Sequence, residues 1–118
     1  MVPTFDEDGY PTEDSLDRIA KFNILDGRAF LSFSERCFCK YYGSWRELKD
    51  SSYSNPEINC GKPFQALRIA TGGWSGNESV VNAMQSNPIW GLLWKASFSG
   101  GLYILELREG YLDILSAS

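Results

Sequence analysis

The chain has 118 residues, a formal net charge of −4 and no histidine. A chain of this length forms one domain with one hydrophobic core. Its acidic balance argues against sequence-independent binding to nucleic acid, which needs a basic surface, and the absence of histidine removes the commonest general base and a frequent zinc ligand.

An acidic arm and a short helix are expected at the N-terminus. Residues 1–11 combine acidic residues with glycine and proline, and they predict an extended arm. Thr12 is a good N-cap residue, and the two acidic residues that follow it lie where the helix dipole favours negative charge. We therefore predict a first helix that begins after Thr12 and ends near Lys21 or Phe22.

A longer amphipathic helix is expected next. Asp26 is a suitable N-cap, and apolar residues are dense from Ala29 to Tyr42, while polar and charged residues occupy the opposite side. Gly43 would end this helix, because glycine readily adopts the left-handed conformation that follows a helix C-terminus. Residues 12–43 are thus expected to form two helices.

The middle of the chain predicts a turn, a loop and one strand. Residues 45–48 are expected to add a short turn, and residues 49–61 are rich in Ser, Asn, Pro and Gly, which predicts a loop. The run of residues 64–70 (FQALRIA) predicts a strand. This strand begins a strand–helix–hairpin unit that we expect over residues 62–118.

A glycine-rich loop leads into the third predicted helix. Residues 71–78 (TGGWSGNE) contain Ser75 and Glu78 at the spacing of a capping box, in which each side chain bonds to a backbone N–H at the helix start. Apolar residues follow on one side of this helix. Asn87-Pro88 should end it, because proline disfavours the helical conformation in the residue before it.

A two-stranded hairpin is predicted around Gly100-Gly101. A two-residue turn at these glycines suits type I′ or II′ geometry and determines how the flanking strands pair. In that register Lys95 lies opposite Glu106, and apolar side chains share one face. Those apolar side chains belong to Trp94, Ala96, Phe98, Tyr103, Leu105 and Leu107. A last edge strand is expected over residues 111–115.

Together these elements predict an α+β fold. The expected order is helix, helix, strand, helix, strand and strand, with one further strand at the C-terminal end. A small antiparallel β-sheet would then carry the helices on its apolar face. Residues 1–118 are expected to form a single domain, since the sequence has no internal repeat and no low-complexity segment.

Neither a metal site nor a cofactor is expected. Cys37 and Cys39 are two residues apart, and on a helix such residues point about 200° away from each other, so they cannot chelate one ion. Cys60 adds at most one thiolate, and no histidine is present to complete a zinc site. We interpret the thiols as buried or incidental.

A catalytic site is not expected either. Without histidine, a Ser-His-Asp or Cys-His arrangement is excluded. A pair of carboxylates is an alternative, with Glu78, Glu106 and Asp113 as candidates, although their spacing does not distinguish them from ordinary surface acids. We therefore favour binding over catalysis.

The glycine-rich loop has two interpretations. As an anion site, it would offer backbone N–H groups at the helix start, with Gly73, Ser75, Gly76 and Arg68 as the binding residues. As a structural connection, it would use its glycines for a tight turn, which we favour because the lysine and the spacing of a P-loop are missing. Trp74 would be either a plug over the sheet edge or an exposed anchor for a partner.

Binding to another protein is the function that the composition favours. The chain has 4 Trp, 6 Tyr and 7 Phe, which is many for this size and indicates a binding face. The acidic balance suits a partner with a basic surface. The candidate contact residues are Trp74, Tyr103, Trp45, Asp6, Glu7 and Asp8. We expect no direct binding to nucleic acid and no membrane contact, and we expect the chain in the cytoplasm because it shows no signal peptide.

Part of the chain resembles a group of small uncharacterised bacterial and phage proteins. The resemblance is carried by the loop TGGWSGNE at 71–78, by a tryptophan-rich segment and by the turn GGxY at 100–103. It implies a bacterial or mobile-element setting, and it implies no catalytic or binding residue. With this setting, we predict an inhibitor that blocks a host defence or nucleic-acid enzyme.

Two alternatives to the inhibitor remain open. An immunity protein that neutralises a bacterial toxin belongs to the same class of binding proteins. A carboxylate-based enzyme, or a small-anion binder that uses the Gly72–Gly76 loop, belongs to another class. A concave pocket that gathers Arg68, Glu78 and Trp74 would favour the second alternative, whereas an apolar patch with an acidic rim would favour the inhibitor.

Overall fold

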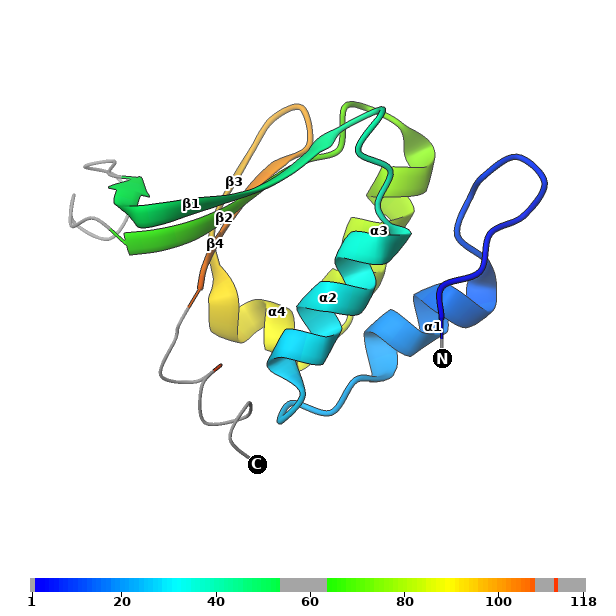
Figure 1. The fold of residues 1–118 in the computed structure, drawn as a ribbon, viewed down its shortest axis with the longest axis horizontal. Coiled ribbons are helices and arrows are strands. Elements are labelled where there is room, and N and C mark those ends of the chain that lie inside the picture. Colours follow the sequence, from blue (N-terminus) through cyan, green and yellow to red (C-terminus); the bar gives the residue numbers. More distant parts are fainter. Residues whose placement is uncertain (1, 54–63, 108–111, 113–118) are drawn as a thin grey trace.

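A computed structural model describes residues 2–53, 64–107 and 112 (Figure 1). Within these residues, four helices pack against a four-stranded antiparallel sheet, which confirms the predicted α+β fold. None of the helices in this part of the chain is both long and apolar enough to cross a membrane.

Helices and strands alternate irregularly along the chain. They are α1 (Glu13–Lys21), α2 (Gly27–Cys37), β1 (Ser44–Tyr53), β2 (Phe64–Ala70), α3 (Ser75–Gln85), α4 (Pro88–Leu93), β3 (Trp94–Phe98) and β4 (Leu102–Glu106). The strand order in the sheet is β1-β2-β4-β3, and every neighbouring pair is antiparallel. The strands β1 and β3 therefore form the two edges, and β2 and β4 form the centre.

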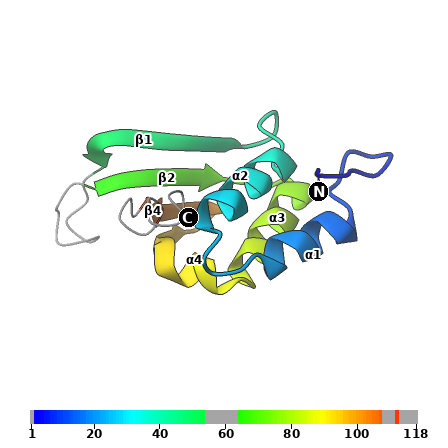
Figure 2. The same ribbon diagram turned by 60° about the horizontal axis from the view of Figure 1, so that its bottom comes forward.

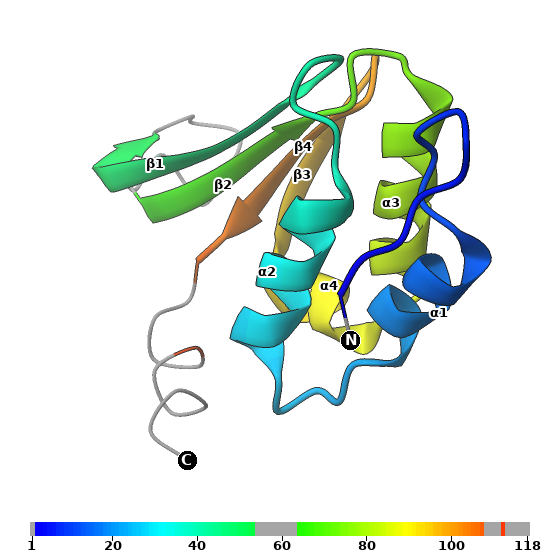
Figure 3. The same cartoon turned by 45° about the vertical axis from the view of Figure 1, so that its right-hand side comes forward.

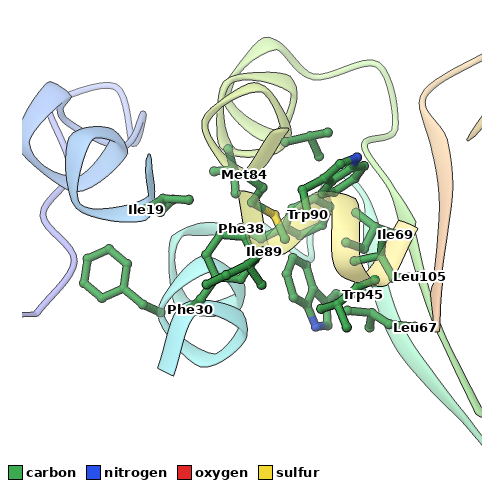
Figure 4. Packing of buried hydrophobic residues seen from close by; sticks show 14 of the residues in the cluster. Ile19, Phe30, Phe38, Trp45, Leu67, Ile69, Met84, Ile89, Trp90 and Leu105 are labelled. Carbon is green, nitrogen blue, oxygen red and sulfur yellow. The ribbon is translucent and has the colours of Figure 1, made fainter. Parts of the chain in front are cut away.

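The core lies between the helices and one face of the sheet (Figure 2). Apolar side chains from all four helices meet there with side chains of β1, β2 and β4. Figure 4 shows this packing for Ile19, Phe30, Met84, Ile89 and Trp90 of the helices and for Trp45, Leu67, Ile69 and Leu105 of the strands. Burial of this apolar surface is the main favourable contribution to folding.

The opposite face of the sheet carries a second, smaller cluster. Ala66 and Ile104 are buried there, and Leu48, Ala96 and Leu102 pack against them. No helix residue of the described chain belongs to this cluster. We refer to this side of the sheet as the helix-free face.

The first helix matches its prediction. α1 begins after Thr12, whose Oγ1 accepts a hydrogen bond from the backbone N–H of Ser15 at 3.4 Å. The acidic residues Glu13 and Asp14 occupy the first turn, and the basic residue Lys21 occupies the last. The side-chain cap at Thr12 and the charged residues at the two helix ends therefore both stabilise α1, the latter through the helix dipole.

The second helix is shorter than predicted. α2 ends at Cys37 instead of continuing to Tyr42. Phe38 leaves the helix with an extended backbone, and its ring packs against Trp45 with 5.5 Å between the ring centroids. The chain leaves the helix here because burial of Phe38 against the sheet stabilises the fold more than another helical turn would.

Strand β1 contradicts the short turn and the start of the loop that the sequence predicted. It pairs with β2, with Ser44 opposite Ala70 and Leu48 opposite Ala66. The second half of β1 forms a strand despite its polar composition, because pairing with β2 supplies the hydrogen bonds of the ladder. Strand β2 matches its prediction, and residues 54–61 of the predicted loop lie outside the described residues.

Helix α3 begins one residue earlier than a capping box requires. Trp74 is its N-cap and no side chain caps its start, so the predicted box of Ser75 and Glu78 is wrong. The predicted end is confirmed, because α3 stops at Gln85, two residues before Asn87.

The sequence did not predict α4. The side chain of Asn87 caps this helix by accepting a hydrogen bond from Ile89 N at 2.9 Å, and Pro88 occupies the first position. The same buried amide donates from Nδ2 to the carbonyl oxygens of Ile19 at 3.0 Å and Phe22 at 2.9 Å. One side chain thus joins the end of α1 to the start of α4.

The hairpin strands β3 and β4 are confirmed, but the predicted register is wrong. Phe98 lies opposite Leu102, so the turn contains three residues instead of two. The carbonyl oxygen of Gly101 accepts a hydrogen bond from Thr71 N at 3.0 Å. Pairing of β4 with the end of β2 therefore decides where the turn ends, and the turn glycines alone do not.

The new register divides the apolar residues of the hairpin between two faces. Tyr103 and Leu105 pack in the core, while Ala96 and Ile104 pack on the helix-free face. Phe98 lies on the helix-free side with its cross-strand partner Leu102. The prediction that all of these apolar side chains share one face of the hairpin is therefore wrong as well.

Two further predictions for the C-terminal end have different outcomes. Lys95 and Glu106 form an ion pair, with 3.8 Å between Nζ and Oε1, although a register shift at Lys95 means that they are not direct cross-strand partners. The predicted edge strand over residues 111–115 lies outside the described residues apart from Leu112, which is buried.

Candidate functional site

Aromatic side chains from three separate segments meet at one end of the molecule. The Trp74 ring lies between the rings of Tyr10, at 4.8 Å between centroids, and Tyr42, at 4.9 Å. Tyr41 contacts Tyr42 edge to face at 5.0 Å. Figure 3 shows the N-terminal turn beside the start of α3, with the α2–β1 connection next to them. We refer to these four residues as the aromatic cluster.

The aromatic cluster is open to solvent. Tyr41 is 88% exposed and Tyr42 is 51% exposed, while Tyr10 and Trp74 are half-buried. Exposed aromatic side chains that stack on one another are typical of protein-binding surfaces, because each ring offers a large apolar area together with a polar group. This cluster is the candidate site.

Trp74 has a structural contact in addition to its place in the cluster. Its ring lies over Gly76, where an added Cβ would overlap the ring atoms. The residue therefore covers the start of α3 and at the same time stacks with two tyrosines. The contact with Gly76 is compatible with the interpretation of Trp74 as an exposed anchor.

Asn77 holds two of the three segments together. Its side chain is fully buried, and Oδ1 accepts a hydrogen bond from Cys39 N at 2.7 Å. Its Nδ2 donates to the carbonyl oxygens of Cys39 at 3.0 Å and Thr71 at 3.2 Å. The α2–β1 connection, which carries Tyr41 and Tyr42, is thereby tied to the glycine-rich loop, which carries Trp74.

The same two segments also approach each other through their backbones. Gly72 has a φ of 69°, and an added Cβ would overlap the carbonyl oxygen of Tyr42. Glycine is the residue that accepts both the left-handed conformation and this close approach. The glycine-rich loop is therefore built to lie directly against Tyr42.

The N-terminal segment is a closed turn, which corrects the predicted extended arm. Phe5 and Pro11 form an isolated antiparallel bridge. The carboxylate of Asp6 accepts hydrogen bonds from Asp8 N and Tyr10 N, both at 2.9 Å. A short acidic side chain that bonds to the backbone a few residues later stabilises a turn, which explains why this segment does not extend.

This turn carries negative charge in the segment that leads to Tyr10, a member of the aromatic cluster. Residues 6–8, the acidic turn, are exposed carboxylates. The hydroxyl of Ser75 donates to the hydroxyl of Tyr10 at 3.2 Å, which joins the turn to the start of α3. The acidic turn is thus connected to Trp74 through Tyr10, whose backbone N–H bonds to Asp6 and whose ring contacts the Trp74 ring.

Two other predicted contact residues lie in the core. Trp45 is 8% exposed and packs against Phe38. Tyr103 is half-buried and contacts Trp90 edge to face at 5.6 Å between centroids. Neither side chain belongs to the aromatic cluster.

Three members of the cluster were missed from the sequence. Tyr41 and Tyr42 were assigned to the buried face of a long helix, and the end of α2 at Cys37 releases them to the surface. Tyr10 lay in the segment expected to be an extended arm. The one signal that could have indicated an exposed pair is two adjacent tyrosines directly before Gly43, because glycine is frequent in surface turns.

The residues of the alternative anion site are engaged elsewhere. The N–H of Gly73 donates to a hydroxyl within its own loop at 3.3 Å, and Gly76 lies under the Trp74 ring. Arg68 lies on the helix-free face, where its Nη1 donates to Ser44 Oγ at 3.5 Å. These residues do not converge on one point.

The candidate carboxylates are also dispersed. Glu106 pairs with Lys95, Glu78 is exposed in the first turn of α3, and Asp113 lies outside the described residues. Over the part of the chain that the structure describes, no group of three or more Cys, Asp or Glu side chains is arranged to hold a metal ion.

A cavity of about 440 Å³ lies between α2 and the sheet. Its lining combines apolar with polar and charged side chains: Arg28, Leu31, Ser32, Glu35, Trp45, Glu47, Gln65, Leu67, Leu107 and Leu112. It does not bring together Arg68, Glu78 and Trp74, the combination that would favour a small-ligand site at the glycine-rich loop.

We expect Cys37 to make the stability of the fold depend on pH in the alkaline range. The side chain is buried, and this burial raises the pKa of its thiol from 9.0 to about 11. The unfolded chain therefore releases this proton at lower pH than the folded chain, so the stability that the thiol contributes is present below about pH 9 and is lost as the pH rises to about 11. We expect the melting temperature of the wild type to fall more steeply over this range than that of Cys37→Ala. An equal fall in melting temperature with pH for the two proteins would contradict this prediction.

Comparison of this chain with models of protein families, with curated protein sequences and with solved structures found no match.

Proposed function

We propose that this protein binds another protein through the aromatic cluster and the acidic turn. The observation that carries the proposal is the stack of Tyr10, Trp74 and Tyr42, which continues to the almost fully exposed Tyr41. Rings that are already held in place by stacking and by buried contacts lose little conformational entropy on binding. A preorganised aromatic surface of this kind is a typical centre of a protein interface.

The partner should present basic residues beside an apolar patch. The side chains of Glu7 and Asp8 are exposed in the turn that leads to Tyr10 of the cluster, and the chain carries a net charge of −4. Opposite charge on the partner would speed up association and would align the two surfaces. Cations on the partner would also be attracted to the faces of exposed tyrosine rings.

The biological role that we propose is inhibition of a host defence or nucleic-acid enzyme by a phage- or mobile-element-encoded protein in the cytoplasm. The resemblance of the loop at 71–78 to phage and bacterial proteins supports the setting. The acidic turn supports the target class, because enzymes that act on nucleic acid carry basic surfaces. An immunity protein would use the same surface against a basic toxin, and a toxin gene directly upstream would favour that alternative.

Tyr41→Ala tests this proposal most directly. We expect at least tenfold weaker binding, equivalent to about 1.4 kcal/mol, because the ring is a contact at the open end of the cluster. The melting temperature should not change, since the side chain is 88% exposed. The partner is first captured from bacterial lysate with the tagged wild type and identified by mass spectrometry, and its affinity for each variant is then measured by calorimetry.

A control variant and a charge variant accompany Tyr41→Ala. Leu25→Ala removes another exposed apolar side chain, in the α1–α2 connection, and should bind like the wild type. Glu7→Gln with Asp8→Asn should slow association and reduce its dependence on salt, while Asp6 still holds the turn. Equal affinities of the wild type and Tyr41→Ala would show that the partner binds elsewhere.

A further inference from the structure

Two arginines lie directly opposite each other on the helix-free face. Arg46 of β1 and Arg68 of β2 are cross-strand partners, and Arg68 is also the partner of Ile104, which belongs to the cluster on that face. The Cβ atoms of opposite residues on antiparallel strands are about 5 Å apart, so two guanidinium groups at these positions repel each other. Such a pair is stabilised when an anion binds between the two groups.

In the described part of the chain, no carboxylate neutralises this pair. Arg68 donates from Nη1 to the neutral hydroxyl of Ser44 at 3.5 Å. The ion pairs of the described residues join Lys40 to Glu35 and Lys95 to Glu106. Glu106 lies opposite Ala66 on the helix-free face, two positions along β4 from Ile104, and no ion pair joins it to either arginine in the described residues. The chain is acidic as a whole, with a net charge of −4, so this local excess of positive charge does not follow from the composition.

An apolar strip borders the arginine pair. Ile104 lies directly beside Arg68 in the sheet and is buried, while Leu102 and Ala96 are half-buried. Phe98, on the edge strand β3, is 39% exposed on the same side. Because neighbouring strands are about 4.8 Å apart, this strip begins within one side-chain length of the guanidinium groups.

We propose that the helix-free face is a second binding surface, and that its occupant is a protein segment with a carboxylate next to an apolar side chain. The planar guanidinium group of arginine binds a carboxylate through two parallel hydrogen bonds, which suits Asp or Glu. The apolar strip on β4 and β3 would receive the neighbouring apolar side chain. Nucleic acid is a poorer fit, because two arginines on an acidic protein offer few phosphate contacts. This surface shares no residue with the aromatic cluster.

Two matched peptides test the proposal. The probe is acetyl-Leu-Glu-Glu-Leu-amide, and its control replaces both glutamates with glutamine. In an NMR titration of the full chain, we expect the glutamate peptide to shift the side-chain N–H signals of Arg46 and Arg68 and the signals of Ile104. The glutamine peptide should bind at least tenfold more weakly. Equal binding of the two peptides, or shifts confined to the aromatic cluster, would overturn the proposal.

Variants of the protein give a second, independent readout. Arg46→Gln and Arg68→Gln should each weaken binding of the glutamate peptide at least tenfold, and without peptide each should raise the melting temperature because the repulsion is removed. Arg36→Gln, which removes an exposed arginine from α2, is the matched control and should change neither property. Phe98→Ser, which retains both arginines, should weaken binding of the glutamate peptide several-fold. If inorganic phosphate binds the arginine pair as tightly as the peptide does, the face is an anion site and the apolar strip has no role.

Discussion

Replacing Gly72 with alanine should lower the free energy of unfolding by about 3 kcal/mol or more, because the substitution adds both backbone strain and a steric clash. Gly72 has a φ of 69°, a conformation that residues with a Cβ rarely adopt. The new Cβ would also overlap the carbonyl oxygen of Tyr42. Because this oxygen belongs to the backbone, no side-chain rotation relieves the clash, and the glycine-rich loop has to move away from the α2–β1 connection.

Gly73→Ala separates the two causes. Gly73 also has a left-handed backbone, with a φ of 77°, but nothing lies within 4 Å of its added Cβ. This variant should lose only about 1 kcal/mol, the cost of the backbone conformation. Urea unfolding curves of the wild type and both variants measure the difference. If the two variants are equally stable, the close approach of the loop to Tyr42 does not exist in solution.

Asn77→Ala should also lower the free energy of unfolding by about 3 kcal/mol or more, because it leaves buried polar groups without partners. The N–H of Cys39 and the carbonyl oxygens of Cys39 and Thr71 all bond to this side chain. The exposed residue Asn82 on the same helix provides the matched control, and Asn82→Ala should have little effect. Equal stability of the two variants, measured in urea, would show that the buried network contributes nothing.

Asn77→Asp identifies which half of the amide matters. An aspartate would still accept the hydrogen bond from Cys39 N, but its second oxygen would face the carbonyl oxygens of Cys39 and Thr71. Its charged form is repelled there, whereas its protonated form can donate one hydrogen bond. The loss of stability should therefore be larger at neutral pH than at acidic pH. A loss that does not change with pH would contradict this charge repulsion, and no loss at all would assign the whole contribution of Asn77 to its acceptor oxygen.

These buried contacts connect stability to the proposed function. Three separate segments form the binding surface, because its rings come from the N-terminal turn, the α2–β1 connection and the loop before α3. Gly72 and Asn77 hold two of these segments in register. Variants at either position should thus lose partner binding together with stability, whereas Tyr41→Ala should lose binding alone.

Several elements could be predicted because their signals are local. Thr12 followed by two acids indicated the start of α1, and the apolar run in residues 64–70 indicated β2. The glycines around Trp74 indicated a tight connection into α3. Each of these signals depends on how a residue and its near neighbours shape the backbone, so it can be detected without knowledge of the fold.

The candidate site was predicted in part. Trp74 and the acidic residues 6–8 were selected as contacts, and in the structure Tyr10 connects the acidic turn to the Trp74 ring. Trp45 was selected only because it is aromatic, and the fold buries it under α2. Aromatic composition alone does not tell which rings fill the core and which remain at the surface, since that depends on where neighbouring elements pack.

The sequence by itself determined the α+β class, the ends of α1 and the glycine-rich connection before α3. Only the tertiary structure decided where α2 ends, that β1 is a strand, how β3 and β4 pair, and which aromatic rings meet. The physical reason is that these features depend on contacts between residues far apart in the chain. Phe38 leaves its helix to pack on the sheet, Gly101 bonds to Thr71, and the Tyr10 ring stacks on Trp74. Local propensity is too weak to oppose such contacts, because burial and hydrogen bonding to a distant partner contribute more than the preference of a single residue.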